Sequence, residues 1–247
     1  GGLFRGTMGQ SISYQSEIAD IILPRLGTTL TMVIPAFIIG TITGILFGII
    51  AAKNRGKTID SVISFFANIG VSMPMFWLGM MGMLVFALKL RVLPSSGYVP
   101  ITRDFGGWLS HMIMPIIVLS LGVNAGFVRL TRSSMLETIR QDYIRTARAK
   151  GLKEKVVIYS HAWRNALLPV STSIMGWIIS VFTGGSLVIE TTFALNGTGR
   201  LYWQALNNTD YELVLAMQMF YTVVSLVGVL LTDLSYGLVD PRVRVNK

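Results

Sequence analysis

The sequence predicts an all-α integral membrane protein, and its composition and the spacing of its charges both support this fold class. Hydrophobic residues make up 52% of the 247 residues and charged residues only 13%, whereas about a quarter of the residues in soluble domains are charged. Five intervals carry no Asp, Glu, Lys or Arg, and each is long enough to cross a bilayer as a helix, which takes about twenty residues. These intervals are 26–52, 61–88, 105–128, 165–189 and 213–232.

The loops between these intervals predict an orientation, because Lys and Arg in short loops stay on the cytoplasmic side. Fifteen Lys or Arg lie in the segments 53–60, 129–164 and 237–247, and five lie in the segments 1–25, 91–104 and 190–212. We therefore expect a multi-pass protein with a cytoplasmic carboxyl terminus. Five spans then leave the amino terminus outside, so we expect that the complete protein has six spans, one of them upstream of residue 1.

Small residues inside the spans predict close helix packing. Gly40, Gly44 and Gly48 recur every four residues in the first span, and Gly122 and Gly126 do so in the third. This spacing lets two helix backbones approach each other. Packing within one subunit is the favoured interpretation, and an interface between subunits is the alternative. Proline inside the first three spans, at positions 35, 74 and 115, predicts kinks.

The spans offer little chemistry for ion coupling or catalysis. Asn124 is a strongly polar but uncharged residue inside them, while Glu190, Asp60 and Asp233 lie at span ends. A transporter driven by an ion gradient normally keeps ionisable groups near the middle of the membrane. Energy for uphill transport would therefore have to arrive through a cytoplasmic loop.

Other site types are also disfavoured. The chain has no cysteine, and its two histidines, His111 and His161, are isolated, so we expect no metal site and no cofactor in this chain. Residues 51–58 loosely fit a phosphate-binding loop, but an apolar span precedes them instead of a strand, so we interpret them as a cytoplasmic basic loop. The net charge of +9 is explained by orientation in the membrane, and no nucleic-acid partner is expected.

The segment 129–168 is the largest predicted cytoplasmic loop, with nine Lys or Arg against three acids. Ser134 and Glu137 have the spacing of a capping box, and Ile139, Tyr143 and Ala147 would share one face of the helix that follows. Gly151 could end that helix in a left-handed conformation. A second helix would carry an apolar stripe, formed by Leu152, Val156, Tyr159, Trp163 and Leu167. The pattern predicts a helix, a glycine turn and a helix, although a basic helix lying on anionic lipid remains an alternative.

Several motifs in this chain resemble those of ABC importer permeases, in the variant of the dipeptide, oligopeptide and nickel permeases. The most specific are Tyr143–Gly151 and His161–Pro169, which are similar to the cytoplasmic signature loop of that family. Further matches are Ser133–Glu137, Glu190–Phe193, Gly197, Gly199–Leu201 and Asp240–Arg242. The resemblance extends from about residue 9 to residue 244. Residues 194–199 depart from it, because many relatives have a proline before Gly197.

The resemblance implies a type I importer fold, with residues 1–247 forming a single transmembrane permease domain in the inner membrane of a prokaryote. It implies that a second permease subunit completes the path, that two cytoplasmic ATPase subunits bind ATP and magnesium, and that an extracytoplasmic binding protein delivers the substrate. The chain itself would not be an enzyme. The residues of the loop that would couple it to an ATPase are Asp142, Tyr143, Arg145, Thr146, Ala147, Arg148, Ala149, Lys150 and Gly151.

The substrate is less clearly indicated, because the signature loop would bind the ATPase and not the cargo. Peptides are the favoured substrate, nickel or another small solute is the alternative, and a membrane scaffold that transports nothing is the alternative from another class. Residues of the substrate path cannot be assigned from the sequence. Polar or methionine-rich positions in the spans, namely Asn124, Ser72, Met73, Met75 and Trp77, are candidates that packing explains equally well.

Overall fold

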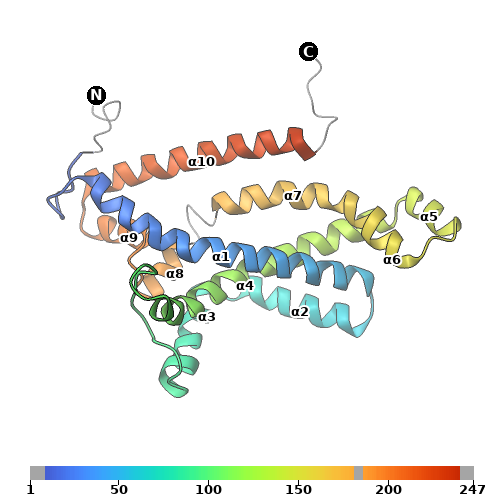
Figure 1. Cartoon of the computed structure of the whole chain (residues 1–247), viewed down its shortest axis with the longest axis horizontal. Helices are drawn as coiled ribbons and strands as arrows, with labels where there is room; N and C mark the ends of the chain where they lie inside the picture. The colour runs from blue at the N-terminus through green and yellow to red at the C-terminus, as the bar shows by residue number, and fades with distance from the viewer. Residues whose placement is uncertain (1–8, 181–185, 240–247) are drawn as a thin grey trace, which may run out of the picture. The chain divides into compact units, whose positions relative to one another are not determined.

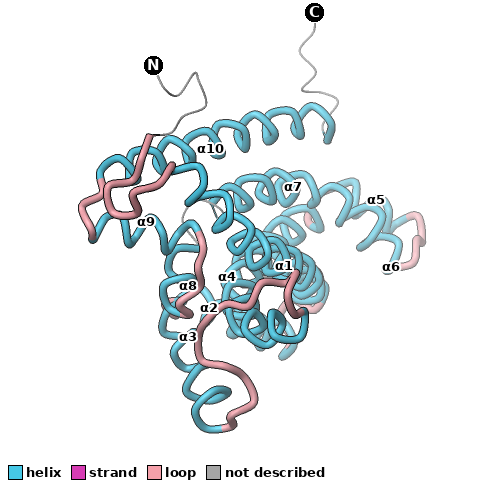
Figure 2. The backbone as a smooth tube through the Cα atoms, turned by 60° about the vertical axis from the view of Figure 1, so that its left-hand side comes forward, coloured by secondary structure: helices cyan, strands magenta, loops and turns pink. Residues whose placement is uncertain are grey.

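A computed structural model describes residues 9–180 and 186–239, and in these residues all regular secondary structure is helical (Figure 2), apart from one isolated bridge between Gln10 and Glu17. In chain order the elements are α1 (Ile18–Lys53), α2 (Thr58–Ser72), α3 (Met75–Gly82), the π-helix η2 (Met83–Lys89), α4 (Phe105–Ile139), α5 (Asp142–Ala149), α6 (Glu154–Val156), the π-helix η3 (Val157–Ala162), α7 (Trp163–Ser180), α8 (Ser186–Thr192), α9 (Thr198–Asn207) and α10 (Tyr211–Val239).

Three helices in the described residues are long and apolar enough to cross a membrane: α1, α4 and the part of α10 from Tyr211 to Thr232. The pair formed by α2 and α3–η2 would be a fourth, although its two halves meet at 102°. The predicted interval 165–189 includes residues 181–185, which lie outside the described residues. The count of five spans out of six therefore stays a prediction.

The bend between α2 and α3 has a local cause. Met73 has an extended backbone (φ −83°, ψ 132°) and ends α2, and Pro74 follows it as the N-cap of α3. Proline disfavours helical conformation in the residue before it, which explains why the apolar interval 61–88 is not one straight helix. Pro35 and Pro115, by contrast, lie inside helices that continue past them.

The chain forms two compact units. One comprises Gly1–Phe37, Pro74–Leu119 and Ile179–Val227, and the other comprises Ile38–Met73, Ser120–Ile178 and Gly228–Lys247. We call them the first and the second unit. Several long helices contribute to both, so each unit is assembled from segments that lie far apart in the sequence.

In the second unit, the glycine repeat of α1 packs directly on α4. A Cβ atom at Gly40, Gly44 or Gly48 would lie 2.6–2.7 Å from atoms of α4, which is too close for any side chain. Beside this contact the amide of Asn124 donates a hydrogen bond to the Thr43 hydroxyl at 2.7 Å. The repeat therefore serves packing within the subunit, as the favoured interpretation of the sequence had it.

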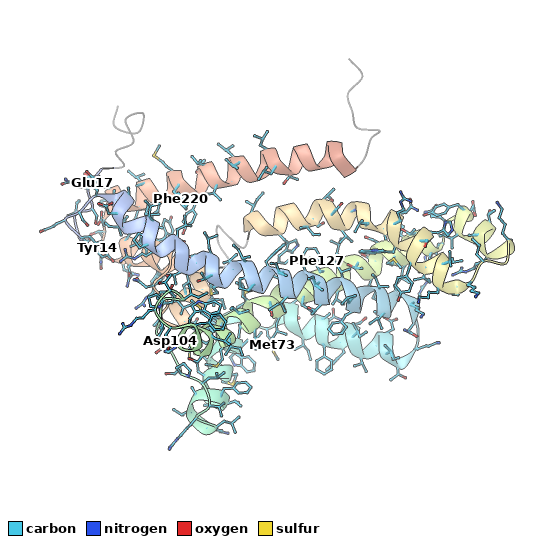
Figure 3. The ribbon with its side chains drawn as sticks, viewed as in Figure 1. Tyr14, Glu17, Met73, Asp104, Phe127 and Phe220 are labelled. Atoms are coloured by element: carbon cyan, nitrogen blue, oxygen red, sulfur yellow. The ribbon has the colours of Figure 1, made fainter. Side chains whose placement is uncertain are left out.

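The same unit also holds α7 against α4. A Cβ atom at Gly126 would lie 2.6 Å from the Trp177 ring. The Trp177 ring also packs on Phe127, labelled in Figure 3, with 6.0 Å between ring centroids. Bulky aromatic rings thus fill the space that the glycine leaves, and the third-span glycine has a packing role too.

In the first unit, α9 lies beside the first turns of α1 and α10 (Figure 1). Buried apolar residues of all three helices form one cluster: Ile18, Ile21, Ile22, Leu201, Ala205, Leu213, Met217 and Tyr221. Asp210 fixes the start of α10, because its carboxylate accepts hydrogen bonds from the Leu213 amide (3.2 Å), the Ser11 hydroxyl (2.5 Å) and the Ser13 amide (3.0 Å). The segment before α1 is thereby tied to the turn before α10.

Candidate coupling site

The segment 129–168 folds into the end of α4, the short helix α5, a glycine turn, and the start of the α6–η3–α7 run. Figure 1 shows α5 and α6 next to one another at the N-terminal end of α7. The predicted capping box is wrong, because α4 continues through Ser134 to Ile139. Ser134 is buried inside that helix, and its carbonyl accepts a hydrogen bond from the Thr138 hydroxyl at 2.8 Å. The break falls instead at Gln141, whose extended backbone precedes α5.

An apolar cluster in the second unit, which we call the coupling cluster, anchors α5. Two residues of α5, Ile144 (0% exposed) and Ala147 (6%), belong to it. The other members come from α1, α4, η3 and α7: Ile49, Ala52, Met135, Val157, Ile158, Ala162 and Ala166. An eight-residue helix is not stable alone, so these contacts position α5 against the ends of two long helices.

The prediction that Ile139, Tyr143 and Ala147 share one face of a single helix is wrong. Ala147 is buried and Ile139 packs against the coupling cluster, but Tyr143 is 44% exposed and Ile144 takes its place in the interior. The reason is the break at Gln141, which puts Ile139 on α4 and Tyr143 on a different helix. The residual contact of Tyr143 raises the pKa of its phenol through partial burial.

The opposite face of α5 is exposed and mostly basic. Its exposed residues are Asp142, Tyr143, Arg145, Thr146, Arg148 and Ala149, and Lys150 follows directly. Arg145 lies 3.5 Å from Asp142, but both side chains are largely in solvent, so the pair contributes little to stability. Most of the predicted coupling residues therefore lie together on one accessible surface, with Ala147 beneath it.

Gly151 makes the turn that follows. Its φ of +75° is in the left-handed region, and a Cβ atom there would meet nothing within 4 Å, so the backbone conformation and not crowding explains the glycine. Arg148 spans the turn with hydrogen bonds to the Glu154 carboxylate of 2.8 and 3.2 Å. The Arg148 guanidinium lowers the pKa of Glu154. Arg148 thus braces the turn as well as adding charge to the exposed face.

The predicted apolar stripe after the turn has the wrong phase. Leu152, Val156, Tyr159 and Leu167 are each 36–43% exposed, and of the five only Trp163 packs against the coupling cluster. The buried positions are Val157, Ile158, Ala162 and Ala166. The offset is already present at Val157, the first residue of η3, which is buried in place of Val156.

An ion pair that the sequence did not reveal joins α2 to α4 in the same unit. Arg132 donates two hydrogen bonds to Asp60, of 2.7 and 2.9 Å, and the Gly56 amide adds a third of 3.1 Å. Asp60 is only 5% exposed. The two partners are 72 residues apart in sequence, so no local spacing marks them. The pair fixes the turn that follows α1. Residues 51–58 form the end of α1, a turn at 54–57 and the start of α2, instead of a phosphate-binding loop.

A second polar network lies in the first unit and explains the motif around Glu190. The Glu190 carboxylate is fully buried and accepts hydrogen bonds from the Thr29 hydroxyl (2.7 Å) and the Arg200 amide (2.9 Å). The Thr198 amide donates to the Thr29 hydroxyl at 2.9 Å. A Cβ atom at Gly197 would overlap the carboxylate. Glu190 therefore caps the first turn of α9, which requires glycine at its N-cap position.

The departure from the family pattern before Gly197 is accommodated locally. Asn196, the residue before Gly197, accepts a hydrogen bond from the Arg25 side chain at 3.3 Å. Ala194 has a positive φ of 55°, and its carbonyl accepts a hydrogen bond from Arg200 at 2.7 Å. The loop thus keeps a defined shape without the proline.

Comparison with known proteins assigns the family. The sequence profile described as "binding-protein-dependent transport system inner membrane component" matches residues 44–245. The oligopeptide transport system permease protein AppB of Bacillus subtilis (strain 168) is 38% identical over 246 residues, which cover 98% of this chain and 78% of the relative. The dipeptide transport system permease protein DppB of the same strain is 37% identical over 241 residues, or 97% and 75% of the two chains.

Solved structures show the same fold at low sequence identity. An amino acid ABC transporter with histidines matches with a TM-score of 0.66 at 16% identity, over 88% of this chain and 94% of that one. An inward-facing MetNI methionine ABC transporter matches with a TM-score of 0.64 at 16% identity, over 86% and 95% of the two chains. These likenesses confirm the predicted fold class, a helical transmembrane domain of the ABC transporter type.

Proposed function

Because the chain belongs to the family of binding-protein-dependent transport system inner membrane components, we propose that it is a permease subunit of an ATP-driven importer of peptides. It pairs with a second permease subunit to form the path across the inner membrane. An extracytoplasmic binding protein delivers the peptide, and two ATPase subunits hydrolyse ATP. ATP and its magnesium ion are bound by those partners.

The observation that carries this proposal is the two-sided arrangement of α5. One side, Ile144 and Ala147, is locked into the coupling cluster with residues of α1, α4 and α7. The other side offers Tyr143, Arg145, Thr146 and Lys150 to a partner. A short helix held in this way moves as a rigid body with the long helices, so a displacement imposed by an ATPase reaches the membrane part.

The arrangement also argues against a helix that simply rests on anionic lipid. Lipid binding depends on summed charge along a basic segment, and it needs no defined side-chain geometry. Here Ile144 and Ala147 are buried in the coupling cluster, which fixes how α5 is presented. Such a fixed presentation is what docking into a groove of another protein requires.

Peptides are the substrate that the relatives support best. The two permeases from Bacillus subtilis are named for oligopeptides and dipeptides, and they match over nearly the whole length of this chain. Nickel or another small solute is the alternative within the same family. Transport of a peptide by the purified complex decides between them directly.

The test is reconstitution of the permease with its co-purifying subunits into liposomes. We expect two ATPase subunits to co-purify with it, and ATP on their side to drive uptake of a peptide such as trialanine after proton and sodium gradients have been collapsed. Uptake that follows an ion gradient without ATP would contradict the proposal. Purification without any ATPase subunit would favour the scaffold, and uptake of nickel but not of peptide would favour the alternative substrate.

A further inference from the structure

One face of α10 carries a polar stripe that the fold does not explain. Gln218, Thr222 and Ser225 follow one another at spacings of four and three residues, so they lie on the same side of the helix over about 10 Å. Gln218 and Thr222 are exposed and Ser225 is half-buried. The exposed surface on either side of the stripe is apolar, as in a lipid-facing helix, with Leu215 at 64% and Val223 at 59% exposure.

A polar stripe in such a helix is not expected to face lipid. An amide or hydroxyl in the hydrocarbon core loses its hydrogen bonds to water, and polar groups in membrane helices therefore face a helix bundle or a water-filled cavity. Only 22% of the span window of α10 is buried within the protein. The stripe must consequently meet water, a ligand or another subunit.

The stripe borders a cavity of about 360 Å³, which lies entirely within the first unit. Its polar lining comes from Gln218, Thr222 and Ser225, together with Tyr202 of α9 and Tyr221 of α10. The two tyrosine rings stand edge to face with centroids 6.0 Å apart. This volume is at the lower end of those that hold small ligands.

The chemistry of this lining fits neutral amide groups. The Gln218 side chain offers both a donor and an acceptor, as a peptide bond does, and the Ser225 hydroxyl can serve either role. The Thr222 hydroxyl already donates a hydrogen bond to the Gln218 backbone carbonyl at 2.8 Å, so it offers a ligand an acceptor only. The Tyr202 hydroxyl lies 3.5 Å from the Gln218 oxygen, which is too long to occupy that amide fully. No charged side chain and no histidine is among the described residues that line the cavity, so the lining suits neither an isolated charge nor nickel.

We propose that the cavity beside Gln218, Thr222 and Ser225 is a contact site for the backbone of a peptide in transit. This proposal rests on the function proposed above and specifies the substrate-path residues. Contacts to backbone amides are the same for every peptide, so the site tolerates many sequences. The tyrosine rings provide flat apolar walls against which side chains of different size can lie.

The first test measures uptake in the reconstituted complex. Gln218→Leu removes the amide at nearly constant size, and we expect it to raise the half-saturating concentration of trialanine, or to lower its maximal uptake, by about tenfold, the range of one lost hydrogen bond to a buried partner. Met219→Leu, on the neighbouring apolar face, is the matched control and should stay within about twofold. Basal ATP hydrolysis should be unchanged in Met219→Leu, because this residue belongs neither to the stripe nor to α5.

Comparing tripeptides of different charge makes this test more specific. Trialanine, Lys-Ala-Ala and Glu-Ala-Ala should lose uptake by the same factor in Gln218→Leu, because the contact is to the backbone. An effect confined to one of the charged peptides would overturn the proposal. If the wild-type complex imports no peptide, the proposed function is refuted. If the wild-type complex and Gln218→Leu import peptides equally well, this site alone is refuted.

The second test needs no transport and uses the absence of cysteine from the chain. Ser225→Cys in the assembled complex should react with a water-soluble maleimide, and saturating trialanine should slow that reaction at least threefold. Val227→Cys, 50% exposed but directed away from the stripe, should not react. Failure of position 225 to react would mean that lipid or the second permease covers the stripe, and labelling unaffected by trialanine would mean a water-filled space with no peptide contact. Either outcome overturns the proposal.

Discussion

Replacing Ile144 by Ala tests the claim that α5 transmits movement through its buried side. Ile144 is 0% exposed and is one of only two α5 residues in the coupling cluster, so this change leaves the docking surface intact. A buried Ile→Ala change costs about 2–5 kcal/mol. Because α5 has eight residues and no stability of its own, the loss falls on its attachment, and it shifts the balance between attached and detached α5 by roughly thirtyfold to several-thousandfold.

Two measurements follow the effect of this change. Hydrogen exchange of residues 142–150 should accelerate in Ile144→Ala, while exchange in the interior of α4 stays as in the wild type. Uptake should fall to a small fraction of the wild-type rate, while the ATPase subunits still bind and hydrolyse ATP. Ile144→Val, expected to cost about 0.5–1.5 kcal/mol, is the control and should retain most uptake. Normal uptake together with unchanged exchange protection in Ile144→Ala would refute the claim that α5 transmits movement through its buried side.

Three further predictions concern orientation and the two polar networks. Cysteine at Arg148 should react with a membrane-impermeant reagent only after the cells are opened, whereas cysteine at Ser96 or Asn208 should react in intact spheroplasts; labelling at 148 from outside would reverse the orientation. Gly197→Ala should displace the Glu190 carboxylate, since the added Cβ would overlap that group. It should lower the stability of the complex to heat by about 0.5–2 kcal/mol, the cost of a lost helix cap. Gly27→Ala is the control and should leave the stability unchanged, because a Cβ there meets nothing within 4 Å. Asp60→Asn should leave Arg132 without its ion partner and destabilise the adjoining ends of α2 and α4 by about 1–3 kcal/mol, less than a fully buried pair because the Arg132 side chain is 31% exposed; thermal stability equal to that of the wild type would show that the pair is dispensable.

The lengths of the charge-free intervals predicted more of this fold than the short local motifs did. Charge-free intervals located α1, α4 and α10 because the membrane requires such lengths of apolar helix. The capping-box spacing at Ser134 was misleading, since the apolar contacts of Met135 and Ile139 with the coupling cluster hold α4 together past that point. Tertiary packing overrode a local signal there, whereas a local signal decided the break at Pro74, which split an apolar interval into two helices.

The candidate site was predictable in position but not in detail. Gly151 and the basic residues around it mark the loop, because a left-handed glycine and exposed charge are visible in sequence. The ion pair of Asp60 with Arg132 joins residues 72 positions apart, and such a contact has no signature in one sequence. The stripe on α10 was visible as spacing, but only exposure on an otherwise apolar helix distinguishes it from ordinary packing.

Cross-linking of α5 to an ATPase subunit tests the central claim most directly. A single cysteine at Thr146, on the exposed face of α5, would be compared in the assembled complex with one at Ser160, which is also exposed but lies on η3. With a short bifunctional thiol reagent, and a single engineered cysteine in the ATPase subunit at its permease-facing surface, we predict an efficient cross-link from position 146 and little from position 160. Equal cross-linking from both positions, or none from position 146 in a complex that retains its ATPase subunits, would contradict the assignment of α5 as the coupling helix.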